Sequence, residues 1–124
     1  MNTVYKVLVV DDDPYILMSL EFLMKKNGYE VIVARNGEEA LEILSKSTPD
    51  IVLLDIMMPD VNGYDICKHI KSTEKLKNIK VIFMSAKTKE SDIKKGYELG
   101  AALYVKKPFS TRELVKDIKT MLEV

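Results

Sequence analysis

The sequence predicts an α/β fold in which helices cover both faces of a doubly wound, five-stranded parallel sheet. Five short runs rich in apolar and β-branched residues are each followed by a segment with helical spacing of apolar residues. These runs are apolar on both faces, which is typical of parallel strands buried on both sides. The 124 residues suit one core of ordinary size. We therefore expect a single domain over residues 1–124.

The first strand, helix and second strand follow from the opening residues. Lys6–Val10 is β-branched and apolar, and Pro14 is well suited to the first position of the helix that follows. Gly28 supplies a stop for this helix, and Glu30–Ala34 then predicts the second strand. Apolar residues at helical spacing form the face expected to be buried: Ile16, Leu20, Leu23 and Met24.

The middle of the chain predicts two helices around the third strand. Asn36–Ser45 is a short helix that Asn36 can cap, and Ile51–Leu54 is a strand that ends at Asp55. Met58–Gly63 is rich in turn-forming residues and leads into the third helix. That helix places three residues on one face: Tyr64, Cys67 and Ile70.

The last part of the chain completes the alternation. Lys80–Met84 predicts the fourth strand, and Glu90–Leu99 predicts a weaker helix that Gly100 stops. Ala102–Val105 is a short fifth strand, and Ser110–Glu113 has the spacing of a capping box. The final helix turns four apolar residues toward the core: Leu114, Ile118, Met121 and Leu122.

The composition favours a cytoplasmic protein. Hydrophobic residues make up 47% of the chain and charged residues 31%, and no run approaches the roughly 20 apolar residues of a membrane helix. The N-terminus has no apolar signal region, and the single cysteine, Cys67, excludes an internal disulfide. We therefore expect no membrane insertion.

Charge is unevenly distributed although the net charge is zero. Residues 1–60 contain 11 acidic and 5 basic side chains, which gives −6, and residues 61–124 contain 8 acidic and 14 basic side chains, which gives +6. The basic residues are spread along helical segments rather than gathered on one face. We therefore expect no direct nucleic-acid binding, and an acidic partner for the second half remains open.

Polar side chains stand at the carboxyl ends of the predicted strands. Asp11 and Asp12 follow the first strand, Asp55 ends the third, Ser85 ends the fourth, and Lys107 follows the fifth. In a doubly wound sheet these ends meet at one edge, where ligands bind. The fold therefore brings three carboxylates, a hydroxyl and an ammonium group together.

Three adjacent carboxylates repel one another, so something must compensate for their charge. They can share protons, with one pKa raised, or they can bind a cation. Mg²⁺ takes oxygen ligands and keeps several waters, which suits an open site with two or three carboxylates. Lys107 adds a positive charge. Such a site is suited to holding a phosphoryl group, because phosphoryl transfer depends mostly on positioning and charge neutralisation.

Four segments in this order, VLVVDDDP, LLDIMMPDVNG, MSAK and YVKKPF, resemble the motifs of response-regulator receiver domains. The resemblance covers nearly the whole chain and is closest to receivers of the stand-alone chemotaxis-regulator type. It implies a (βα)5 flavodoxin-like receiver fold. It also implies a two-component phosphoprotein that acts as a switch and catalyses only its own phosphoryl transfer and dephosphorylation.

The resemblance assigns the acceptor and the metal ligands residue by residue. Asp55 matches the phosphoacceptor, and Asp12 matches the acidic residue that binds Mg²⁺ directly. Asp11 matches the neighbour that acts through metal-bound water, and Met57 matches the position whose backbone carbonyl completes the metal site.

The resemblance also assigns the switch. Ser85 matches the hydroxyl residue that meets the phosphoryl group, and Lys107 matches the lysine that contacts a phosphoryl oxygen and precedes a cis peptide bond to Pro108. Tyr104 matches the aromatic residue that turns inward when Ser85 moves. The implied partners are a sensor histidine kinase or a phosphotransfer protein, and a downstream protein target read by the face of the fourth helix, fifth strand and fifth helix.

The main alternative is a phosphatase of the haloacid-dehalogenase type. Asp11 and Asp13 have the Asp-x-Asp spacing of the nucleophile and acid pair of those enzymes. Against it, no acidic pair follows Lys107, and the second aspartate is followed by Pro14 and Tyr15 rather than the expected Thr or Val. Replacing Asp11 or Asp55 distinguishes the two readings, because only the nucleophile is essential for covalent phosphorylation.

Overall fold

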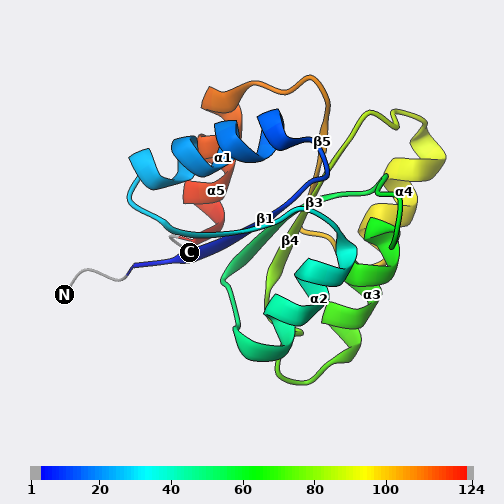
Figure 1. Ribbon diagram of the computed structural model, residues 1–124. Coiled ribbons are helices and arrows are strands. Elements are labelled where there is room, and N and C mark those ends of the chain that lie inside the picture. Colours follow the sequence, from blue (N-terminus) through cyan, green and yellow to red (C-terminus); the bar gives the residue numbers. More distant parts are fainter. Residues whose placement is uncertain (1–3, 123–124) are drawn as a thin grey trace.

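A computed structural model describes residues 4–122, in which five strands alternate with five helices (Figure 1). The strands are β1 Lys6–Val10, β2 Glu30–Ala34, β3 Ile51–Asp55, β4 Lys80–Ser85 and β5 Leu103–Lys106. The helices are α1 Pro14–Lys26, α2 Gly37–Lys46, α3 Gly63–Ser72, α4 Glu90–Glu98 and α5 Thr111–Leu122. Within residues 4–122, no helix has the length and apolar character needed to cross a membrane.

The five strands form one parallel sheet in the order β2-β1-β3-β4-β5. This is the strand order of the flavodoxin-like doubly wound fold, in which the winding direction reverses between β1 and β3. The carboxyl ends of β1 and β3 therefore border the crevice where such sheets bind ligands. Asp11 follows β1 directly and Asp55 is the last residue of β3.

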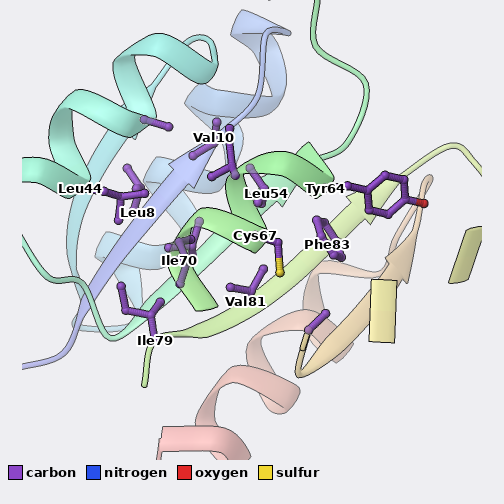
Figure 2. Packing of buried hydrophobic residues seen from close by; sticks show 14 of the residues in the cluster. Leu8, Val10, Leu44, Leu54, Tyr64, Cys67, Ile70, Ile79, Val81 and Phe83 are labelled. Atoms are coloured by element: carbon purple, nitrogen blue, oxygen red, sulfur yellow. The ribbon is translucent and has the colours of Figure 1, made fainter. Parts of the chain in front are cut away.

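Helices cover both faces of the sheet, as predicted (Figure 1). Helices α1 and α5 pack on one face, against strand residues such as Val7 and Leu53. Helices α2, α3 and α4 pack on the other face, against neighbours such as Leu8 and Leu54. Figure 2 shows this second core, and Phe83 of β4 is among its fully buried side chains. The alternation of side chains along each strand thus fills two separate cores.

The predicted elements are confirmed, with small corrections at their ends. Strands β3 and β4 each extend by one residue into the site, because Asp55 pairs with Met84 and Ser85 pairs with Lys106. Strand β5 is Leu103–Lys106 rather than Ala102–Val105, because the ladder with β4 pairs Ile82 with Leu103 and continues to Ser85.

The core-facing side of α1 includes one residue that the prediction left out, Leu17. Leu17, Leu20 and Met24 are buried, whereas Ile16 and Leu23 are only partly buried at the border of the core. Leu17 lies one helical turn before Leu20 on the same side of the helix, and Asp13 caps the helix by accepting the backbone N–H groups of Tyr15 and Ile16.

Candidate functional site

Three carboxylates meet at the carboxyl ends of β1 and β3. Asp11, Asp12 and Asp55 each offer an oxygen atom, and these atoms all lie within 4.8 Å of one another. Asp11 and Asp55 are buried and Asp12 is exposed, so the cluster opens to solvent on one side. An open set of carboxylate oxygens fits Mg²⁺, which prefers oxygen ligands and keeps part of its water shell.

Lys107 brings the compensating positive charge from the end of β5. Its Nζ lies 2.8 Å from Asp11 Oδ2 and 3.6 Å from Asp55 Oδ1. Lys107 directly follows β5, and the peptide bond between Lys107 and Pro108 is cis. Burial disfavours the charged lysine, but the hydrogen bond and attraction from Asp11, together with Asp55, outweigh it and raise the pKa of Lys107. The ammonium group therefore stays charged between two carboxylates, and its shorter contact is with Asp11.

The pKa of Asp55 is raised from 3.8 to about 6. Burial is the largest cause, since the residue is only 5% exposed, and the negative charges of Asp11 and Asp12 act in the same direction. Lys107 and a backbone hydrogen bond from Met57 lower the pKa without cancelling these effects. A raised pKa is one of the two ways in which crowded carboxylates reduce their mutual repulsion, and the other is a bound cation.

Met57 and Asp13 occupy different places around this cluster. The side chain of Met57 is 58% exposed, so its contact with Asp55 is made by its backbone. Asp13 uses its carboxylate to cap α1 and lies outside the group of three carboxylates. The spatial arrangement therefore does not support the Asp11 and Asp13 pair of the alternative reading.

Gly63 allows α3 to begin directly against the end of β3. Its N–H donates to Ile56 O at 2.9 Å, and Asn62 caps the helix by accepting the N–H of Tyr64. A Cβ atom at Gly63 would lie 2.7 Å from Ile56 Cα and would also meet the Asp55 carbonyl. Backbone cannot yield as a flexible side chain can, so the position of Asp55 depends on the absence of a side chain here.

Gly63→Ala should lower the free energy of unfolding by about 3 kcal/mol, at the upper end of the usual range for overpacking, because the neighbours are backbone atoms. Urea denaturation followed by circular dichroism measures it. Gly28→Ala is the matched control, because Gly28 has a φ of +89° but nothing within 4 Å of its added Cβ. The control should lose about 1–2 kcal/mol from backbone strain. Equal losses in the two variants would show that the close approach at Gly63 is unimportant.

Ser85 and Tyr104 belong to a hydrogen-bonded chain beside the carboxylates. Ser85 Oγ accepts the N–H of Lys87 at 3.0 Å, and the Tyr104 hydroxyl donates to Lys87 O at 2.8 Å. Ser85 is fully buried and Tyr104 is 8% exposed, so the tyrosine ring lies inward. The backbone of Lys87 therefore links the serine at the end of β4 to the aromatic residue of β5.

Two residues around this chain escaped the sequence reasoning as site residues. Tyr64 was expected only as a core residue of α3, yet its hydroxyl donates to Asp92 O of α4 at 3.0 Å. Tyr97 of α4 accepts the N–H of Tyr104 through its hydroxyl at 3.1 Å. Their sequence signal is limited to aromatic side chains on helices next to the strand ends.

A protein-family model for the response regulator receiver domain matches residues 7–119. Among solved structures, the BeF3-activated DrrB receiver domain is similar with a TM-score of 0.90 and 34% identity, covering 98% of this chain and 100% of that one. A putative response regulator from Chloroflexus aurantiacus gives a TM-score of 0.91 and 34% identity with the same coverage. The chemotaxis response regulator CheY4 of Vibrio cholerae gives 0.89 and 29%, covering 95% and 98%. The chain therefore belongs to the response regulator receiver domain family.

Proposed function

We propose that this chain accepts a phosphoryl group on Asp55 from the phosphohistidine of a sensor histidine kinase or phosphotransfer protein, with Mg²⁺ as the cofactor. The observation that carries the proposal is the buried Asp55 carboxylate, which stands between two further aspartates and the Lys107 ammonium group. Asp11, Asp12 and Asp55, with the backbone carbonyl of Met57, would hold the cation. When bound, the cation would neutralise charge on the carboxylates and on the transferring phosphoryl oxygens.

The transfer is a displacement at phosphorus. An oxygen of the ionised Asp55 carboxylate forms a bond to phosphorus while the phosphorus–nitrogen bond of the donor histidine breaks. The bonding electron pair leaves with the imidazole nitrogen, which takes up a proton from solvent water. Lys107 already lies 3.6 Å from Asp55 Oδ1 and can contact a phosphoryl oxygen there. The protein thereby contributes positioning and charge rather than a separate acid or base.

Phosphorylation would shift an existing equilibrium between two arrangements of the site. A phosphoryl group on Asp55 offers acceptor oxygens to the Ser85 hydroxyl and to Lys107. The link from Ser85 through Lys87 to Tyr104 gives this shift a route to the surface of α4, β5 and α5. We infer that a downstream protein target reads that face, and that output requires neither nucleic-acid binding nor membrane insertion by this domain.

A surface suited to the phosphodonor borders the site. Tyr15, Met18 and Phe22 are exposed on α1 at positions i, i+3 and i+7. Beside them lies a groove of about 570 Å³ that reaches the site lysine. Its lining includes Tyr15, Ile16, Leu20, Lys107, Pro108 and Phe109. An exposed apolar helix face next to a reactive centre supports docking of a helical donor protein.

We further propose that residues 1–124 form one receiver domain, that it works in the cytoplasm, and that its only reactions are its own phosphorylation and dephosphorylation. The contacts support a single unit, because every helix packs on one of the two cores of the same sheet.

Intact-mass measurement after incubation with Mg²⁺ and acetyl phosphate tests the function. We expect a gain of one phosphoryl group that disappears when EDTA removes the cation. Because the chain contains no tryptophan, mass is a more direct readout than fluorescence quenching. A chain that gains no phosphoryl group from acetyl phosphate or a phosphorylated kinase, and binds no beryllofluoride, would contradict the proposal.

A further inference from the structure

Helix α4 is attached to the sheet by few apolar contacts. Gly96 is its single buried residue, and Ile93 packs against the core only in part. A Cβ at Gly96 would lie 3.0 Å from Tyr104 Cδ2 and 3.1 Å from Phe83 Cδ2. The helix backbone therefore rests almost directly on these two rings, and polar contacts add to its attachment.

Tyr64 supplies one of these contacts from the neighbouring helix. Its hydroxyl donates to Asp92 O in the first turn of α4 at 3.0 Å, and Lys95 Nζ lies 4.6 Å from the centre of its ring. The ring meets Phe83 edge-on, with centroids 5.4 Å apart, and Phe83 in turn lies 6.2 Å from the ring of Tyr104 (Figure 2 shows Tyr64 and Phe83). A continuous row of aromatic rings thus connects α3 with the inward Tyr104 beneath α4.

We propose that Tyr64 is a positioning residue of the switch: its hydroxyl holds the first turn of α4 over Tyr104 and favours the inward arrangement of that ring. The inference rests on the proposed function. The loop between Ser85 and α4 is fixed at one end by the Ser85, Lys87 and Tyr104 chain, and its other end enters the turn that Tyr64 holds. Loss of either attachment releases the same short segment.

The Tyr64 hydroxyl stays protonated and can therefore donate this hydrogen bond. Burial raises the pKa of Tyr64 to about 12, and the neighbouring Tyr104 and Asp92 act in the same direction. The hydroxyl therefore keeps its proton at all working pH values. A phenylalanine at this position would retain the ring contacts with Phe83 and Lys95. It would remove the hydrogen bond to α4 together with the polar contact between the hydroxyl groups of Tyr64 and Tyr104.

The test compares the affinity of Tyr64→Phe and of the unaltered chain for beryllofluoride with Mg²⁺, measured by ¹⁹F NMR titration. We expect roughly two- to tenfold weaker binding, because one hydrogen bond of ordinary net strength shifts the fraction of binding-competent molecules by that order. Hydrogen exchange of the backbone amides of residues 92–96 should also be faster in the unliganded variant. If the Tyr64 hydroxyl contributed only to the stability of the fold, the folded Tyr64→Phe variant would bind beryllofluoride with the affinity of the unaltered chain.

Tyr5→Phe is the matched control, because the Tyr5 hydroxyl also donates to a backbone carbonyl, that of Leu122 at 3.1 Å, away from the site. It should bind beryllofluoride as the unaltered chain does. Tyr104→Phe should weaken binding, and the double variant with Tyr64→Phe should weaken it by less than the product of the single effects. Unchanged affinity of Tyr64→Phe beside normal binding by the unaltered chain would overturn the inference alone. Failure of the unaltered chain both to bind beryllofluoride and to gain a phosphoryl group would instead overturn the proposed function, and the inference with it.

Discussion

Asp55→Asn should abolish covalent phosphorylation, whereas Asp11→Asn should slow it and leave it detectable. An amide oxygen is a poor nucleophile, so removing the acceptor carboxylate removes the bond that would form to phosphorus. Asp11 instead holds Lys107 at 2.8 Å and belongs to the group of carboxylates that can hold a cation. Its loss weakens positioning and leaves the acceptor in place. Intact mass after treatment with Mg²⁺ and acetyl phosphate measures both variants.

Asp65→Asn serves as the control, because Asp65 is an exposed carboxylate in the first turn of α3 and lies outside the site. It should gain one phosphoryl group as the unaltered chain does. The opposite pattern, with phosphorylation lost in Asp11→Asn and kept in Asp55→Asn, would make Asp11 the nucleophile and would revive the phosphatase reading. Mapping the modified residue after borohydride reduction of the acyl phosphate would then distinguish the two aspartates directly.

The fold could be predicted from the sequence because two sequence signals mark the strands. Apolar, β-branched runs are unusual outside buried strands, and each run ends abruptly at a polar residue such as Asp11, Asp55 or Ser85. The strand ends themselves were less predictable. Backbone pairing does not depend on side-chain polarity, so β3 and β4 continue through Asp55 and Ser85 into the site.

The location of the site could also be predicted, because parallel topology gathers the carboxyl ends of strands at one edge. Which carboxylate lies nearest to Lys107 could not be predicted from the sequence. From the sequence, Lys107 is as compatible with Asp55 as with Asp11, and only the spatial arrangement gives Asp11 the shorter contact.

The contacts of Tyr64 were beyond sequence reasoning for a similar reason. Helical spacing predicts which face of α3 is buried, and it correctly placed Tyr64 on that face. The bond from its hydroxyl to Asp92 depends on the separation of α3 and α4, which the sequence does not reveal for two residues 28 positions apart. Helical spacing also left Leu17 out of the predicted face of α1, although Leu17 is buried and Ile16 only packs against the border of the core.

Asp55→Asn should also stabilise the metal-free protein, by about 2–3 kcal/mol in the free energy of unfolding at pH 7.5. The pKa of Asp55 rises from 3.8 to about 6 on folding, so the ionised carboxylate is disfavoured in the folded state. At roughly 1.4 kcal/mol per pKa unit, this is a cost of about 3 kcal/mol that an uncharged asparagine avoids. Urea denaturation in EDTA measures the difference, with Asp65→Asn as a control that should change stability by less than about 0.5 kcal/mol.

The sign of the pH dependence follows from the same shift. Below pH 3.8 the carboxyl is protonated in both states and costs nothing. Between about pH 4 and 6 the unfolded chain ionises while the folded chain keeps its proton, so the contribution of Asp55 to stability falls as pH rises and reaches its full penalty above pH 6. Asp55→Asn should therefore gain little at pH 4 and most above pH 6. The proposed binding of Mg²⁺ to the ionised folded site would stabilise the unaltered chain by a few kcal/mol at saturating Mg²⁺ and pH 7.5, and would reduce the difference in stability between the unaltered chain and the variant. If Asp55→Asn does not raise the free energy of unfolding in EDTA at pH 7.5, repulsion among the three carboxylates does not destabilise the folded protein. The argument from charge for a cation at this site would then fail.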